Sequence, residues 1–265
     1  MPVLVRPDGV VQVGWDPRRA VLVRPPDGLT AVGLTVALRA LASPMSRADF
    51  QRLAGPGAGA LLSALVGAGV VHPHRRPRGR ALSIRVNGAG PLSELLADGL
   101  RRSGARVARS ANAAGAPAGV DLVVLADQLA ADPRLVRELQ AARVPHLPVR
   151  LRDGVGVVGP LVIPGLSSCL CCADLHRTDR DPAWPALAAQ LREVVGVADR
   201  PTVLATVAFA LAQLQQILAA VRAGDPPPPP PATLNATVEV DVAAASIVAR
   251  RWSRHPLCGC WAGGG

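Results

Sequence analysis

Residues 82–93 read Leu-Ser-Ile-Arg-Val-Asn-Gly-Ala-Gly-Pro-Leu-Ser, in which every second residue up to Val86 is apolar and two glycines and a proline follow. Leu82 to Val86 predicts a strand, and the stretch from Pro91 to Ser103 predicts a helix. A strand, a glycine turn and a helix in this order begin a βαβ unit, in which the helix crosses back over the sheet. This stretch therefore predicts an α/β fold.

The same alternation continues along the chain. We expect strands at 105–108, 120–126 and 144–149, with a helix at 133–142, and such alternation predicts a parallel sheet with right-handed crossovers. This is the front half of a Rossmann-like domain. Short strands are expected at 154–160 and 161–163. A charged region with a short helix near 184–194, a helix at 201–222, a proline tract at 226–231 and two strands at 233–240 and 244–250 follow.

The N-terminal part of the chain forms a separate unit in this interpretation. Alternating apolar residues at 10–13 and 20–23 predict a hairpin, and helices are expected at 29–41, 46–53 and 58–68. The middle helix begins with a capping signal, Ser46 followed by Asp49. We therefore predict a winged-helix-like module at 1–74, a Pro- and Arg-rich linker at 75–80, and a Rossmann-like domain at 81–265.

The composition limits the classes of function. The chain has 265 residues, a net charge of +10 and only 2% aromatic residues, and all of its basic residues are arginine. Arginines spread along the chain without aromatic residues between them do not favour nucleic-acid binding. The N-terminus lacks the pattern of a signal peptide, and Gln213, Gln215 and Gln216 interrupt the most apolar helix. These features predict a cytoplasmic protein.

All five cysteines lie in two clusters, Cys169-Leu-Cys171-Cys172 and Cys258-Gly-Cys260. Two short chelating pairs from distant loops are typical of a tetrahedral zinc site, so we predict Cys169, Cys172, Cys258 and Cys260 as its ligands. Four thiolates fill the coordination shell, which makes a structural metal the expectation. A redox pair and buried apolar thiols are the alternatives. Cys171 is left without a role.

The glycine turn is also a candidate nucleotide site. Gly88 and Gly90 would let the backbone approach a phosphate at the helix N-terminus, and Asp127, with Asp121 at the other flank of the strand, could bind magnesium. The pattern is incomplete, however. Ser93 replaces a third glycine, Pro91 removes an N–H, and no acid follows at the spacing of a ribose ligand. A structural turn is the competing interpretation.

Residues 144–165, the first cysteine cluster with the residues up to Pro185, and the terminal His255-Pro-Leu-Cys-Gly-Cys260 together resemble ThiF-like, ubiquitin-activating-enzyme-like proteins. More narrowly, they resemble the cyclodehydratase partner proteins of thiazole/oxazole-modified peptide (bacteriocin) biosynthesis. The resemblance covers about residues 80–260, and the N-terminal module is similar to the leader-peptide recognition element of such proteins. It implies one structural zinc on the two cysteine pairs, a ribosomal precursor peptide and a YcaO-type enzyme as partners, and leaves a homodimer open.

Adenylating members of this family use a four-glycine ATP loop, a ribose-binding acid and usually a lysine, and this sequence departs from each. We therefore expect a zinc-stabilised scaffold that binds a peptide by strand addition and has no adenylation activity of its own. The first alternative is an ATP-dependent adenylyltransferase that uses Gly88, Gly90 and Asp127 with magnesium. The second is a DNA-binding regulator acting through the winged helix. The charged residues 174–181 have an ion-paired surface loop as their expected structure.

Overall fold

The computed structural model describes residues 1–71, 81–111, 119–222 and 229–261. The chain divides into two units, Met1–Arg78 and Gly79–Gly265. The arginine-rich linker predicted at 75–80 and the first part of the proline tract at 226–231 lie outside the described residues.

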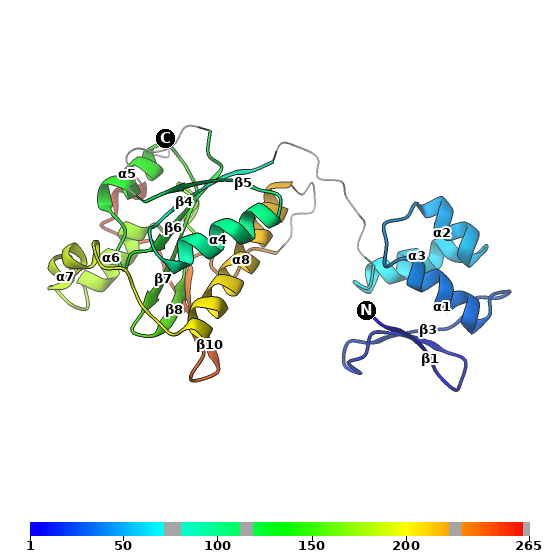
Figure 1. Cartoon of the computed structure of the whole chain (residues 1–265). Coiled ribbons are helices and arrows are strands. Elements are labelled where there is room, and N and C mark those ends of the chain that lie inside the picture. The colour runs from blue at the N-terminus through cyan, green and yellow to red at the C-terminus, as the bar shows by residue number, and fades with distance from the viewer. Residues whose placement is uncertain (72–80, 112–118, 223–228, 262–265) are drawn as a thin grey trace. The chain divides into compact units, whose positions relative to one another are not determined.

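The N-terminal unit consists of a three-stranded antiparallel sheet and three helices (Figure 1). The strands β1 (Val3–Val5), β2 (Val11–Val13) and β3 (Val21–Val23) lie in that order, so β1 and β3 form the two edges. The helices are α1 (Ala31–Ala40), α2 (Arg47–Ala54) and α3 (Ala58–Gly67). The hairpin and the three helices match the sequence prediction, because their apolar residues repeat with the periods of strand and helix.

Local signals place the helices of this unit. Ser46 caps α2: its hydroxyl accepts a hydrogen bond of 3.0 Å from the backbone N–H of Asp49, whose carboxylate accepts from the N–H of Ser46. The predicted capping box is therefore confirmed. One core cluster joins the inner side of the sheet to α1 and α3, and a second surrounds the fully buried Phe50 of α2.

The second unit is built around a seven-stranded sheet of order β10-β9-β8-β7-β6-β4-β5. Four strands are mutually parallel: β5 (Arg106–Ser110), β4 (Ser83–Asn87), β6 (Leu122–Asp127) and β7 (His146–Arg152). The antiparallel strands β8 (Val155–Val158), β9 (Ala236–Asp241) and β10 (Ser246–Arg251) extend the sheet. The sheet is therefore mixed, and its parallel half agrees with the βαβ prediction.

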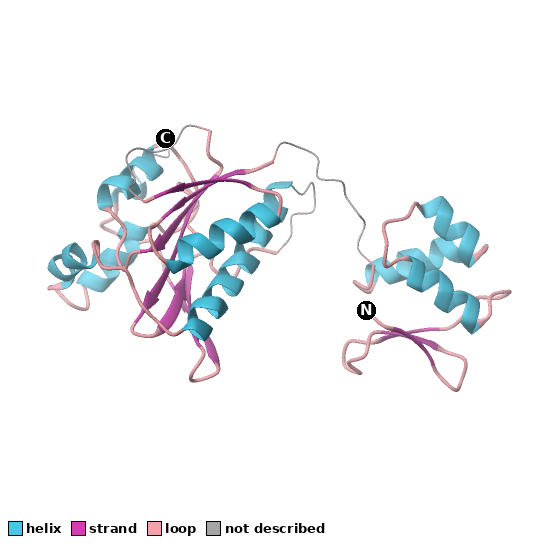
Figure 2. Ribbon diagram, viewed as in Figure 1, coloured by secondary structure: helices cyan, strands magenta, loops and turns pink. Residues whose placement is uncertain are grey.

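Helices cover both faces of this sheet (Figure 2). On one face, α4 (Pro91–Arg102) and α8 (Arg200–Arg222) bury Leu92, Leu96, Val203 and Leu214 against the strands. On the other face, α5 (Pro133–Ala141) and α6 (Leu170–Thr178) pack with the cysteines, and α7 (Trp184–Leu191) follows α6. By length and composition α8 could cross a membrane. Here, however, one side of the helix, with Val203, Val207, Ala210, Leu214 and Leu218, is buried in the core, as the sequence predicts.

Two sequence expectations were wrong. The region after the first cysteine cluster was expected to be a loop as far as 184, but α6 occupies residues Leu170–Thr178. Its short, charged sequence hides the helical period, and the helix is ordered by packing of Cys172 and Ala173, both buried. Residues 161–163 do not form a strand: Leu161 and Val162 make only isolated bridges, to Leu234 and His146.

Candidate metal centre and glycine loop

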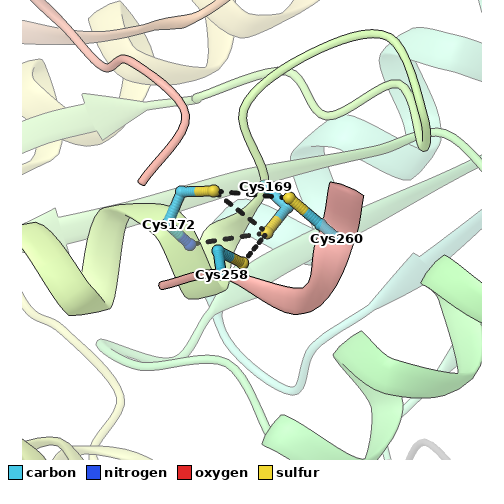
Figure 3. A group of neighbouring side chains, drawn as sticks. All are labelled: Cys169, Cys172, Cys258 and Cys260. Carbon is cyan, nitrogen blue, oxygen red and sulfur yellow. Dashed lines mark hydrogen bonds between the residues drawn. The ribbon is translucent and has the colours of Figure 1, made fainter. Parts of the chain in front are cut away.

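Four of the five cysteines converge on the α5 face of the sheet. Cys169 is the N-cap residue of α6, and Cys172 lies in the first turn of that helix. Cys258 and Cys260 belong to the tail after β10, in which Gly259–Trp261 form the short 3₁₀ helix η1. Figure 3 shows the four thiols gathered between the start of α6 and this tail. Cys171, the remaining cysteine, is exposed and lies outside the group.

The sulfur separations fit a tetrahedral ion. The Sγ atoms of Cys169 and Cys258 are 3.5 Å apart, those of Cys172 and Cys260 are 3.5 Å apart, and those of Cys169 and Cys172 are 3.6 Å apart. Four thiolates at zinc–sulfur distances of about 2.3 Å would stand about 3.8 Å from one another. The four ligand atoms all lie within 4.8 Å of one another, so these residues could hold a metal ion.

Burial opposes ionisation of two of these thiols when no metal is bound. It raises the pKa of Cys169 strongly and that of Cys260 to about 12. Burial also acts to raise the pKa of Cys258, but hydrogen bonds from the Cys260 backbone and the Cys169 thiol outweigh it, so that the pKa of Cys258 is lowered. A cation among the sulfurs would reverse this balance, because a coordinating thiol loses its proton.

A second set of contacts joins α6 to the tail, and we call its residues Asp174, Arg177, Trp184 and Trp252 the tail clasp. The Arg177 guanidinium carbon lies 5.0 Å from the ring centroid of Trp184 and 4.9 Å from that of Trp252. Arg177 also forms an ion pair of 2.8 Å with Asp174, which accepts a hydrogen bond of 3.1 Å from Trp184 Nε1. The clasp therefore fixes α6 against the end of β10 beside the cysteines.

His176, Asp179 and His255 form another close group with metal-ligating atoms. The Nε2 atom of His255 lies 2.9 Å from the Asp179 carboxylate, and the Leu257 N–H donates to His255 Nδ1. These two contacts place the proton of a neutral His255 on Nε2. The Nε2 atom therefore has no lone pair with which to bind a metal. His176 Nε2 lies 3.2 Å from the Ser253 carbonyl oxygen. The group is thus a set of hydrogen bonds between α6 and the tail, which the sequence indicated only as an ion-paired surface loop.

The glycine turn after β4 is closed by a carboxylate of the same chain. One oxygen of Asp127 accepts hydrogen bonds from the backbone N–H groups of Gly90 (2.8 Å) and Ser93 (3.3 Å), and the other from that of Leu92 (2.9 Å). Pro91 has no N–H. Asp127 therefore occupies the donors at the start of α4 that would otherwise face an anion.

The two glycines leave room for this carboxylate. A Cβ atom at Gly90 would lie 2.7 Å from one Asp127 oxygen, and a Cβ atom at Gly88 would lie 2.5 Å from the other. Asp127 is buried and adopts a φ of 74°, a left-handed conformation that is uncommon for residues other than glycine. The glycines that the sequence suggested for a phosphate thus accommodate Asp127. Asp121 lies at the opposite end of β6, where it accepts from the Ser83 N–H at 2.7 Å.

The fold has counterparts among solved structures. No family model matches the chain, and no curated protein matches its sequence. A heterocyclase in complex with substrate and cofactor matches 98% of this chain and 38% of its own length, with a TM-score of 0.67 and 16% identity. The heterocyclase TruD matches 97% of this chain and 41% of its own length, with a TM-score of 0.65 and 16% identity.

A third match has a similar length to this chain. The crystal structure of E. coli MccB with ATP matches 98% of this chain and 97% of its own length, with a TM-score of 0.58 and 13% identity. The chain thus spans about two fifths of the heterocyclases it matches and nearly all of MccB. At these identities the likeness establishes the fold: an α/β architecture of the TruD and MccB type.

Proposed function

We propose that the protein is a zinc-stabilised, ThiF-like scaffold that binds a ribosomal precursor peptide for modification by a partner enzyme, and that it does not itself adenylate a substrate. The partner in this proposal is a YcaO-type enzyme, and both act in the cytoplasm. Residues 1–74 serve as the winged-helix-like peptide-recognition module, residues 75–80 as a linker, and residues 81–265 as the scaffold. The likeness to heterocyclases and MccB supports this proposal at the level of the fold.

The observation that carries the lack of adenylation is the position of Asp127. Its carboxylate accepts three backbone N–H groups at the start of α4, including that of Gly90 at 2.8 Å. A nucleotide phosphate at this loop would have to displace a buried carboxylate or lie beside it, and like charges in a buried site repel strongly. Both oxygens of Asp127 are already hydrogen-bonded, which also opposes a magnesium site on this residue.

In this proposal the metal has a structural role. Cys169, Cys172, Cys258 and Cys260 would supply four thiolates to one zinc, a closed shell without a position for water or substrate. These residues hold the start of α6 to the C-terminal tail, and the tail clasp stabilises the same junction. The zinc site would thus keep the second unit folded rather than take part in chemistry.

Peptide binding is assigned to the edge of the N-terminal sheet. β3 is an edge strand of three residues with the exposed side chain of Leu22 at its centre, and Trp15 in the preceding loop is 82% exposed. An extended peptide can pair with such an edge through main-chain hydrogen bonds and place alternate apolar side chains beside the exposed residues. Arg18, Arg19 and Arg24 flank this strand and favour a peptide with acidic residues.

Calorimetry tests the proposed lack of a nucleotide site. Magnesium-ATP titrated into the zinc-loaded protein should give no saturable binding, and the protein with peptide should not exchange pyrophosphate into ATP. Magnesium-dependent ATP binding together with such exchange would establish the adenylyltransferase alternative instead.

Fluorescence anisotropy tests the peptide-recognition module. The probe is a labelled synthetic peptide with alternating apolar residues and acidic flanks, the type that the exposed Leu22 and Trp15 and the flanking arginines favour. Leu22→Asp on β3 should weaken binding at least about tenfold, because it places a charge at the proposed peptide edge. The matched control is Leu4→Asp, which changes another exposed leucine at the centre of the opposite edge strand β1 and should bind as the wild type does. Equal losses in the two variants would contradict the β3 assignment, and salt-sensitive binding of duplex DNA would favour the regulator alternative.

A further inference from the structure

A cavity of about 580 Å³ opens at the carboxyl ends of β4 and β6 and beside the middle of β7. Besides these strands it is bordered by the start of α5 and by the residues that follow α7. It lies on the α5 face of the sheet, because its residues Leu125 and Leu135 belong to the core cluster on that face. Asp127, Gly88 and Gly90 are not part of its lining. The cavity therefore adjoins the closed glycine loop, through Asn87 and Gln128, but does not include it.

The register of the sheet brings the floor of the cavity together. Asn87 of β4 pairs with Leu125 of β6, which pairs with Pro148 of β7, so the three residues form one row across parallel strands. Side chains in one row point to the same face, and Arg150, two residues beyond Pro148, points to that face as well. All four residues line the cavity.

Asn87 is the residue in this row whose polarity is unexplained. Its side chain is 4% exposed, and neither its Oδ1 nor its Nδ2 has a hydrogen-bond partner among the described residues. A buried amide without partners costs about 1–3 kcal/mol for each unpaired group. A position that needed only packing would hold an apolar residue at lower cost, so a bound ligand explains an asparagine here better than the core does.

The charges around the cavity define what such a ligand must carry. Arg134, Arg150 and Arg192 line it, against the carboxylates of Asp132 and Glu193. Asp132 is already engaged as the N-cap of α5, where it accepts from the Arg134 backbone at 2.8 Å. The charged form of Arg150 is disfavoured where it lies. Burial is the main cause and the nearby Arg177 the second, and together they lower the pKa of Arg150 to about 10. It still carries its charge near neutral pH, and an anion in the cavity would relieve this cost.

We propose that the cavity binds a small oxyanion, a carboxylate or a phosphate, whose neighbouring atoms include a hydrogen-bond donor. The arginines supply the charge-assisted hydrogen bonds to the oxyanion. Asn87 completes the set, because its Nδ2 donates to an oxygen of the ligand while its Oδ1 accepts from the ligand's N–H or O–H. A peptide carboxylate offers an N–H beside the anion, and hydrogen phosphate offers an O–H. A complete nucleotide is not the proposed ligand, because the N–H groups that would hold its phosphates are bonded to Asp127.

Calorimetric titration of the full-length protein at fixed ionic strength tests this site. The probes are inorganic phosphate, N-acetylglycine and the uncharged N-acetylglycinamide. Saturable binding is expected for phosphate or N-acetylglycine and not for the amide, and the tighter of the two anions identifies the source of the oxyanion. Arg134→Gln combined with Arg192→Gln should weaken that binding at least about tenfold, and so should Asn87→Leu.

Matched controls keep the result interpretable. Arg134, Arg192 and Arg137 are all exposed, and Arg137 lies on α5 outside the cavity lining, so Arg137→Gln should bind as the wild type does. The arginine variants test the site even where Asn87→Leu fails to fold. The proposal is overturned by the absence of saturable binding of either anion, by equal losses in the double variant and in Arg137→Gln, or by magnesium-ATP binding more tightly than both anions.

Discussion

The backbone N–H of Gly90 donates a hydrogen bond of 2.8 Å to the carboxylate of Asp127, although the two residues belong to different strand–helix connections. A parallel sheet places the carboxyl ends of β4 and β6 side by side, which brings the residue after one strand into the turn after the other. The carboxylate serves as a cap for α4 and interacts favourably with the helix dipole. The anion bound by the glycine turn is thus the carboxylate of Asp127, a side chain of the same protein.

Neutralising this cap should destabilise the second unit. Asp127→Asn keeps the shape of the side chain but removes its charge and one acceptor, so we expect the free energy of unfolding to fall by roughly 2 kcal/mol in urea titrations. Asp98→Asn is the control: it changes an exposed aspartate in the same helix that pairs with Arg102 at 2.8 Å, and should cost less than about 1 kcal/mol. Similar losses in both variants would show that the buried contact has no special role.

Metal content should follow the four buried or half-buried cysteines and not the fifth. Elemental analysis of the purified protein should give one zinc per chain, and Cys172→Ser should abolish binding and lower the thermal midpoint. Cys171→Ser should retain the metal, because Cys171 is exposed and lies outside the four-thiol group. Treatment of the wild type with a chelator should reproduce the stability of Cys172→Ser, because structural zinc binding contributes directly to folding. Full stability without zinc would contradict this.

His146 should make the protein sensitive to mild acid. Its ring is fully buried on β7, and burial lowers its pKa from 6.5 to about 4, with a hydrogen bond to the Val144 carbonyl acting in the opposite direction. Between these pKa values the unfolded chain binds the proton and the folded protein does not. Stability is therefore complete above pH 6.5 and falls by roughly 3 kcal/mol as the pH decreases to about 4.

Denaturant titrations at several pH values check this sensitivity. His146→Leu should remove most of this slope between pH 6.5 and 5, where a nuclear magnetic resonance titration should also show His146 still neutral. His176, a partly exposed histidine on α6, provides the control position, since His176→Leu should leave the slope in place. A titration of His146 near pH 6.5 would refute the expectation.

The tail clasp should depend on arginine rather than on positive charge alone. Arg177→Lys keeps the charge but loses the planar group that stacks between Trp184 and Trp252, so we expect a loss of roughly 1–2 kcal/mol in the free energy of unfolding. Arg180→Lys, at an exposed position three residues further, should have no measurable effect. Equal stability of both variants would mean that the ion pair with Asp174 accounts for the clasp by itself.

Local patterns in the sequence predicted much of the architecture. The apolar stretch at 120–126, the glycine turn after β4 and the capping box at Ser46 are signals carried by neighbouring residues, so they could be recognised without tertiary information. The spacing of the cysteines likewise indicated which four would meet, since each short pair, Cys169 with Cys172 and Cys258 with Cys260, has the spacing of a chelating metal motif. By contrast, α6 was missed because packing of Cys172 and Ala173, rather than the helical period, orders it.

The sequence by itself determined the α/β class, the separate N-terminal unit and the candidate metal ligands, because each depends on periodicity or on short-range spacing. Only the tertiary structure decided what surrounds the glycine turn and where the arginines gather. Asp127 reaches the Gly90 N–H, and Asn87 lies in one row with Pro148, because the sheet register aligns residues from separate strands. Such contacts are set by strand order and register, which no local pattern of residues encodes.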